Sequence, residues 1–125
     1  MKKVVSTKTA ILLDSELQVF LTERVSMSIK IKARRSFKSF KKQLESYYEE
    51  RNNLVQELGE KTEKVDKAGN VVYNLNNENQ DEFRKQNNEA LEKEIEVEVE
   101  LTLDDLEKVP EESKNFYGNL IDLFI

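Results

Sequence analysis

The chain has 125 residues, and its 20 Lys and Arg against 25 Asp and Glu give a formal net charge of −5. Charged residues make up 36% and hydrophobic residues 38%, and there is no Cys or His. This composition excludes disulfides, thiol nucleophiles, Ser-His-Asp triads and the common ligands of transition metals. The length is typical of one domain, so we expect a single domain over residues 1–125.

The charge is divided along the chain. Residues 1–43 hold 11 basic and 3 acidic side chains, a balance of +8, whereas residues 75–125 hold 5 and 15, a balance of −10. Seven basic side chains and no acid lie between Arg24 and Glu45. Such a run either binds phosphate groups or lies against acidic residues of the same chain or of a partner copy.

Two short elements are expected before the middle of the chain. The apolar spacing after Asp14 and Ser15 predicts a short helix over about 14–24, capped by one of these two residues. The period then changes between 25 and 32, where Ile29 and Ile31 alternate with lysines. This alternation predicts a short strand, or an extended lead-in to the next helix.

The strongest local pattern predicts a long helix over about 33–58. Positions spaced four and three apart form a heptad seam, which is interrupted by one charged residue: Ala33, Phe37, Phe40, Leu44, Tyr47, Arg51, Leu54 and Leu58. Gly59 is expected to end the helix. A helix of this length must pack on another helix, either in the same chain or in a second copy, so the seam predicts a possible homo-oligomer.

A polar segment and two further elements follow. Residues 59–80 predict a hairpin or loop around an Asp66…Gly69-Asn70 turn, and residues 80–93 a second helix. Residues 94–103 predict a strand, because apolar residues alternate there with four glutamates. We expect these glutamates to pair with Lys30 and Lys32 of a strand over 27–32.

The end of the chain predicts short helices. Thr102 and Asp105 have the spacing of a capping box, and Pro110 suits the first position of another helix. The apolar C-terminus is expected to dock in the core. The predicted fold class is therefore α+β, mainly α, with a long helix packed on shorter helices and a small antiparallel sheet or hairpin.

No set of Asp, Glu, Lys or Tyr residues has a spacing that implies a catalytic pocket, so we expect no enzyme, no cofactor and no metal site. Two charged rows are the candidate partner-binding residues. The first is acidic and lies on the predicted strand: Glu94, Glu96, Glu98 and Glu100. The second is basic and lies on the long helix: Arg34, Lys38, Lys41 and Lys42.

The order of these motifs resembles a family of small proteins of unknown function encoded by phages of Gram-positive bacteria. The resemblance covers most of residues 10–125. It is carried by the 29–32 Ile-Lys-Ile-Lys run, the 49–55 and 58–60 segments, the 66–70 turn, the 82–85 and 90–91 segments, the 95–99 strand, the 103–107 segment and the apolar C-terminus. It implies a phage origin and no established activity, so no functional residue is carried over.

Together these observations predict a non-enzymatic, phage-encoded protein-binding module in the host cytoplasm. Its partner would be a host defence or replication factor, as expected for a host-takeover or anti-defence protein. The alternative is a virion structural component or an assembly chaperone that acts as an oligomer and is associated with the virion. A third possibility is nucleic-acid binding through the basic row. No membrane partner is expected, because no apolar run approaches the roughly 20 residues that span a bilayer.

Overall fold

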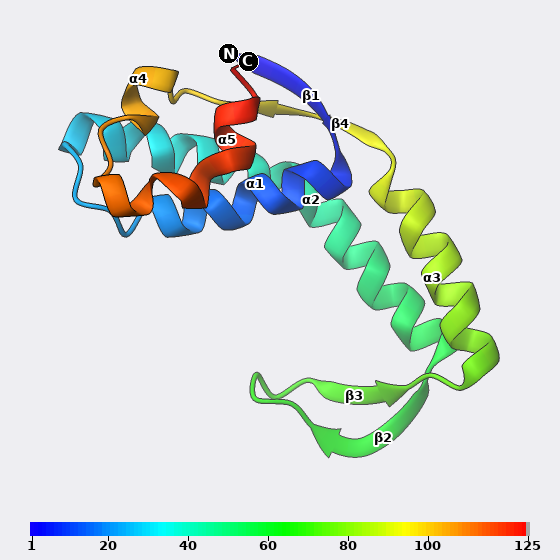
Figure 1. The fold of residues 1–125 in the computed structure, drawn as a ribbon. Coiled ribbons are helices and arrows are strands. Elements are labelled where there is room, and N and C mark those ends of the chain that lie inside the picture. The colour runs from blue at the N-terminus through cyan, green and yellow to red at the C-terminus, as the bar shows by residue number, and fades with distance from the viewer. Residues whose placement is uncertain (125) are drawn as a thin grey trace.

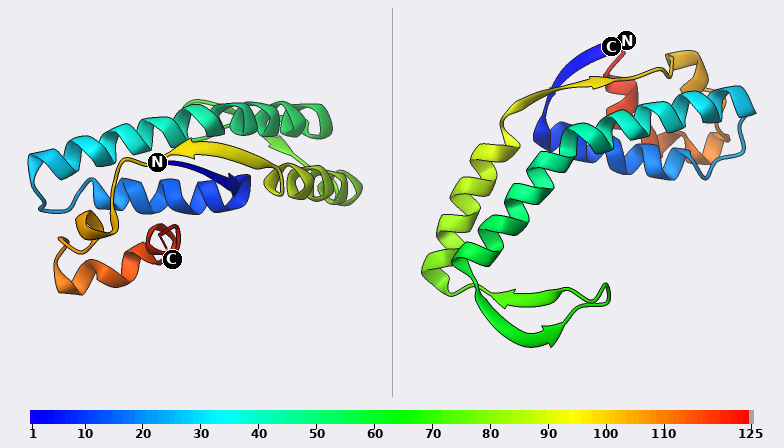
Figure 2. Two further views of the ribbon diagram at one scale, coloured as in Figure 1. Left: turned by 90° about the horizontal axis from the view of Figure 1, so that it is seen from above. Right: turned by 180° about the vertical axis from the view of Figure 1, so that it is seen from behind.

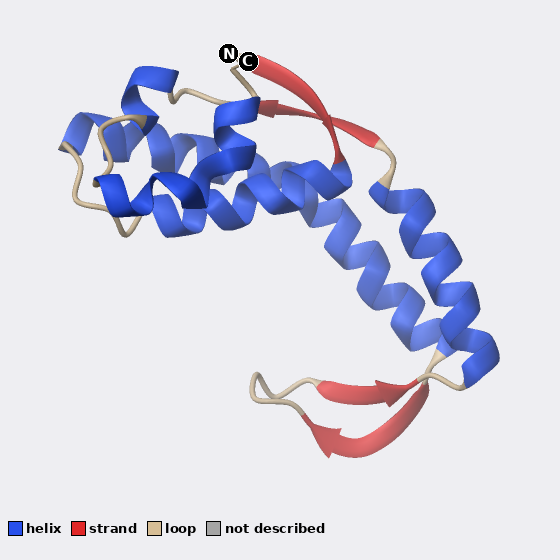
Figure 3. Ribbon diagram, viewed as in Figure 1, coloured by secondary structure: helices blue, strands red, loops and turns tan. Residues whose placement is uncertain are grey.

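The computed structural model describes residues 1–124. Its elements, in chain order, are β1 (Lys2–Ser6), α1 (Thr7–Phe20), α2 (Met27–Leu58), β2 (Glu60–Val65), β3 (Val71–Asn74), α3 (Asn77–Leu91), β4 (Glu94–Glu98), α4 (Leu103–Leu106), the 3-10 helix η1 (Glu111–Tyr117) and α5 (Gly118–Asp122). Helices predominate and the strands form two antiparallel pairs, so the predicted mainly α, α+β class is confirmed (Figure 3). Over residues 1–124, no helix is both long and apolar enough to cross a bilayer.

The molecule has a body and an arm (Figure 1). The body consists of α1, residues 27–44 of α2, the β1–β4 sheet and the C-terminal helices. The arm consists of residues 45–58 of α2 together with α3, and the β2–β3 hairpin lies at its far end. The two views in Figure 2 show that α2 runs through both parts, with β4 leading from the end of α3 back onto the body.

The long helix is confirmed but starts earlier than predicted. Residues 27–32 form the first turns of α2, so the predicted strand over 25–32 is wrong. The Ser26 side chain caps the helix by accepting the Ile29 N–H at 3.3 Å. Ile29 is buried one helical turn before Ala33, whereas Ile31 is exposed. The helical period therefore extends back to Ile29, and the alternation of two isoleucines with two lysines is not that of a strand.

The partner of β4 also differs from the prediction. β1, which the sequence did not reveal, pairs antiparallel with β4, from Lys2 opposite Glu98 to Ser6 opposite Glu94. Regular strand pairing ends at Glu98 and does not continue to residue 103. The other edge of β4 lies against α2, where the Ser39 hydroxyl accepts the Glu98 N–H at 2.9 Å. β4 is thus paired with β1 along one edge and bonded to α2 at Glu98 on the other.

The first helix is longer than the predicted 14–24 segment. It begins directly after β1, because Ser6 accepts the Thr9 N–H at 3.1 Å and caps the helix. Asp14, one of the two residues predicted to cap it, lies instead in the middle of α1 and is buried. Consequently β1 and α1 form one continuous unit that crosses the body.

The core is confined to the body. Its fully buried members come from α1, α2, β4 and its extension, and the C-terminal helices: Ala10, Leu13, Leu17, Phe20, Ala33, Phe40, Leu44, Val97, Val99, Leu101, Leu106, Tyr117 and Leu120. Leu123 and Phe124 pack against this cluster, so docking of the apolar C-terminus is confirmed as far as residue 124. Ile125 lies outside the described residues. Edge-on packing of Phe20 and Tyr117, with ring centroids 5.4 Å apart, fixes the C-terminal helices to α1.

The arm has no core of its own. No residue from Glu45 to Glu96 is buried. Gly59 ends α2 as predicted, and the predicted second helix is confirmed as α3, starting three residues earlier. The predicted turn is also confirmed, with Gly69 at a φ of 85° and the Asp66 carboxylate accepting two backbone N–H groups at 2.9 Å. The arm is therefore held by local hydrogen bonds and half-buried contacts.

Candidate protein-binding surfaces

The acidic row lies mostly on the outer face of the β1–β4 sheet. Glu94, Glu96 and Glu98 alternate along β4 and point to the same side. β1 presents Lys2 opposite Glu98 and Ser6 opposite Glu94. The row is therefore placed on one surface, as predicted, but it faces a strand that sequence reasoning missed.

Most of this acidity is matched by cations of the same chain. The N-terminal amine lies 3.0 Å from Glu98, the Lys2 ammonium 3.7 Å from Glu96 and the Arg35 guanidinium 3.6 Å from Glu100. Within residues 1–124, Glu94 alone among the four has no ion pair. Exposed pairs of this kind contribute about 0–1 kcal/mol each. The pairing lowers the local charge and makes the row a weak electrostatic target.

The predicted cation partners of the row are wrong. Lys30 donates to the Leu21 carbonyl at 2.9 Å, and Lys32 forms an ion pair with Asp105 at 3.0 Å. Both lysines lie on the first turns of α2 and not on a strand, and each is bonded to a residue outside the row. They fasten α2 to the α1–α2 connection and to α4.

The basic row is only partly assembled. Arg34, Lys38 and Lys42 are exposed and lie four residues apart along the side of α2 opposite its buried positions. Lys41 is turned toward α1, where its ammonium lies 3.2 Å from a carboxylate oxygen of Asp14. The Asp14 side chain is only 6% exposed, so this pair joins α1 to α2. The structure thus leaves three of the four predicted cations facing outward.

Two exposed apolar residues continue the surface formed by these three cations toward the start of α2. Met27 is 78% exposed and Ile31 is 45% exposed, one helical turn apart. Together with neighbouring basic side chains they line a shallow groove of about 350 Å³. We call this surface the basic face and define it by five residues: Met27, Ile31, Arg34, Lys38 and Lys42. Within residues 1–124, Arg34, Lys38 and Lys42 form no ion pair.

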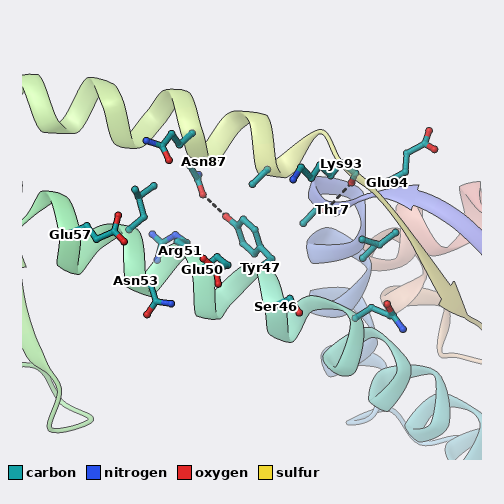
Figure 4. A pocket seen from close by; sticks show the side chains of 15 residues that line it. Thr7, Ser46, Tyr47, Glu50, Arg51, Asn53, Glu57, Asn87, Lys93 and Glu94 are labelled. Atoms are coloured by element: carbon teal, nitrogen blue, oxygen red, sulfur yellow. Dashed lines mark hydrogen bonds between the residues drawn. The ribbon is translucent and has the colours of Figure 1, made fainter.

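A second hollow, the elbow groove, lies between α2 and α3 where the arm meets the body (Figure 4). Its volume is about 410 Å³. Tyr47 reaches across from α2, and its hydroxyl donates to the Asn87 side-chain oxygen at 2.7 Å. The rest of the lining combines amide, hydroxyl and apolar groups with charged side chains of both signs: Thr7, Gln43, Ser46, Glu50, Arg51, Asn53, Leu54, Glu57, Gln86, Ala90, Lys93, Glu94 and Ile95.

Two groups with shifted pKa values, Tyr117 and Asp105, serve the fold. Burial raises the pKa of the Tyr117 phenol, and its hydrogen bond to Glu23 at 2.6 Å raises it further. Burial alone would raise the pKa of Asp105, but hydrogen bonds from Thr102 and Lys32 outweigh it and lower that pKa. The predicted capping box is confirmed by the same contacts. Residues 1–124 contain no group of three or more acidic side chains arranged to hold a metal ion.

Sequence reasoning missed the apolar part of the basic face and the whole elbow groove. The first was detectable, because Met27, Ile31, Arg34 and Lys38 have helical spacing that continues into the long helix. The second was not, because it depends on how α3 is placed against α2. In comparisons with known proteins, the chain matches no protein-family model, no curated protein and no solved structure.

Proposed function

We propose that this chain is a non-enzymatic protein-binding module whose basic face holds an acidic helical segment of another protein. The observation that carries the proposal is the set of three outward cations beside two exposed apolar side chains, with no acid of the described chain neutralising them. An ordinary solvated helix face has charges of both signs and few large apolar residues. The basic face instead carries charge of one sign and two large exposed apolar side chains.

The arrangement suits a helix more than it suits a flat anionic surface. Met27 and Ile31 are spaced to receive apolar side chains from successive turns of a helix lying along α2. Carboxylates on the same helix would then lie beside Arg34 and Lys38. Charge complementarity would speed association and determine which partners bind, while the apolar contacts would supply most of the affinity.

The cellular setting is also part of the proposal. On the resemblance to phage-encoded proteins, we propose that the partner is a bacterial host protein, such as a defence or replication factor, bound in the host cytoplasm. An assembly or virion role is the second candidate. The half-buried outer part of the seam, Tyr47, Leu54 and Leu58, favours it because this stretch could serve self-association.

The test uses a synthetic helical peptide that carries paired leucines four residues apart, flanked by glutamates. Its fluorescence anisotropy is measured with the wild-type protein, with the Arg34→Glu/Lys38→Glu variant and with the Met27→Ser/Ile31→Ser variant. Reversing two charges should weaken binding at least about tenfold, as expected for loss of complementary contacts. The control is Lys61→Glu/Lys64→Glu on the β2–β3 hairpin, which has the same charge change at exposed positions.

A duplex oligonucleotide of similar charge is the competing probe. Tighter binding of the oligonucleotide, with a steep loss as salt rises and no effect of Met27→Ser/Ile31→Ser, would indicate nucleic-acid binding and reject the protein-binding proposal. An equal loss of peptide binding in the hairpin control would also reject it, because binding would then follow net charge alone.

A further inference from the structure

The molecule has a larger accessible surface than a compact chain of this size usually has. The accessible surface is 8690 Å², whereas the scaling for compact monomers of this mass gives about 6,900 Å². The excess is about twice the roughly 800 Å² that each partner buries in a standard stable interface. No residue from Glu45 to Glu96 is buried. The arm is therefore the part of the molecule whose exposed surface is available to form an interface.

The heptad seam identifies the incomplete side of the arm. In the body its members Phe40 and Leu44 are fully buried beneath α1 and the sheet. In the arm the same seam continues through Tyr47 and Leu54, which stay half-buried although α3 lies beside them. These two residues line the elbow groove. A further helix placed there would complete the packing that the seam specifies.

The chemistry of the groove favours a second copy of this chain as the occupant. In a two-fold contact the same patch lies on both sides, so the groups near the axis must tolerate their own kind. Ser46, Asn53 and Gln86, which line the groove, carry hydroxyl and amide groups that both donate and accept hydrogen bonds. They can therefore bond to one another across a contact between two copies, which a groove lined by one sign of charge could not do.

The margins of the groove carry charges of both signs. Glu50, Arg51 and Glu57 lie on the α2 side, and Lys93 and Glu94 lie just after the end of α3. Figure 4 shows Glu50 and Lys93 projecting from these opposite sides. A two-fold contact that sets the α2 side of one copy against the α3 side of the other would bring each Glu50 to a Lys93.

We propose that the elbow groove binds the arm of a second copy of this chain, forming a two-fold dimer in which Glu50 pairs with Lys93 of the other copy. The two arms then make a four-helix layer from α2 and α3 of each copy. The inference does not depend on the proposed function, because it uses none of the residues of the basic face.

The test is a charge exchange followed by sedimentation equilibrium and light scattering. Glu50→Lys and Lys93→Glu should each weaken dimerisation at least about tenfold, since each brings like charges together. The double variant Glu50→Lys/Lys93→Glu should recover to within about threefold of wild type, because the opposite charges face each other again. The control is Glu45→Lys, an exposed charge reversal on the outward side of α2, which should leave the dimer unchanged.

Two results would overturn the inference. One is a wild-type protein that stays monomeric up to about 100 µM, above the range of a specific dimer. The other is a dimer that both single variants leave intact. Glu50 and Lys93 are exposed, and circular dichroism of each variant will show that the helices are retained. The peptide assay on the basic face is unaffected by either result, so the two proposals can fail separately.

Discussion

Ser36 is the buried link between α2 and the extension of β4, and replacing it by alanine should destabilise the body. Its hydroxyl accepts the Glu100 N–H at 2.9 Å and donates to the Lys32 carbonyl at 2.9 Å, and the residue is 0% exposed. Without the hydroxyl the Glu100 N–H loses its partner beside the fully buried Ser36 side chain, which costs about 1–3 kcal/mol. Alanine is the better helix former by about 0.5 kcal/mol. The expected net loss is therefore about 1–2 kcal/mol.

The matched control is Ser39→Ala, one turn further along the same edge. Ser39 accepts the Glu98 N–H at the same distance but is only half-buried, so water can replace its hydroxyl. We expect a loss below about 0.5 kcal/mol there. Urea unfolding followed by circular dichroism measures both free energies, and a loss of about 1 kcal/mol also lowers Tm by about 3–5 °C. Equal losses in the two variants would refute the claim that the loss of stability depends on how far water can reach the unsatisfied N–H.

Two further predictions concern α4 and the arm. The carboxylate of Asp105 has a lowered pKa in the fold, so its contribution to stability is present above its unfolded value of about 3.9 and is lost as pH falls through the folded value. Asp105→Asn should therefore be less stable at neutral pH and lose less stability on acidification, measured by urea unfolding at several pH values. Gly59→Ala should loosen the hairpin, because a Cβ there would lie 2.6 Å from a backbone carbonyl oxygen of α2 and 2.9 Å from the Tyr73 Cβ. Hydrogen exchange should rise in β2 and β3 and stay unchanged in β1 and β4, whereas faster exchange throughout would contradict this assignment.

Elements fixed by neighbouring residues could be predicted from the sequence, and elements fixed by distant contacts could not. The 33–58 helix, the Asp66 turn and the Thr102 capping box each depend on residues within a few positions of one another. β1 is only five residues long, and its partner β4 lies about ninety residues later in the chain. No local pattern in Lys2–Ser6 specifies that pairing. The sequence pattern therefore predicts, wrongly, that Lys30 and Lys32 lie on the strand opposite β4.

The same distinction between neighbouring residues and distant contacts applies to the candidate surfaces. Arg34, Lys38 and Lys42 share a face by helical period alone, and the structure keeps them together. Lys41 was assigned to the same row, but it pairs with Asp14, which sequence reasoning placed at the start of a helix. The true span of α1 buries Asp14 opposite α2, and that span depends on the cap formed by Ser6, the last residue of β1. The wrong start predicted for α1 therefore goes with the wrong placement of Lys41 in the outward basic row.

The two proposed contacts lie on different sides of α2, and this separation has a functional consequence. The basic face is opposite the buried positions of the body, whereas the elbow groove lies beside α3 in the arm. A dimer formed through the arms would leave both basic faces free and hold them at a fixed separation. Two linked sites raise the effective concentration of the second binding event, so avidity can exceed single-site affinity by about 10²–10⁴. Glu50→Lys should then leave binding of one acidic peptide unchanged and weaken only the binding of a partner that presents two such helices.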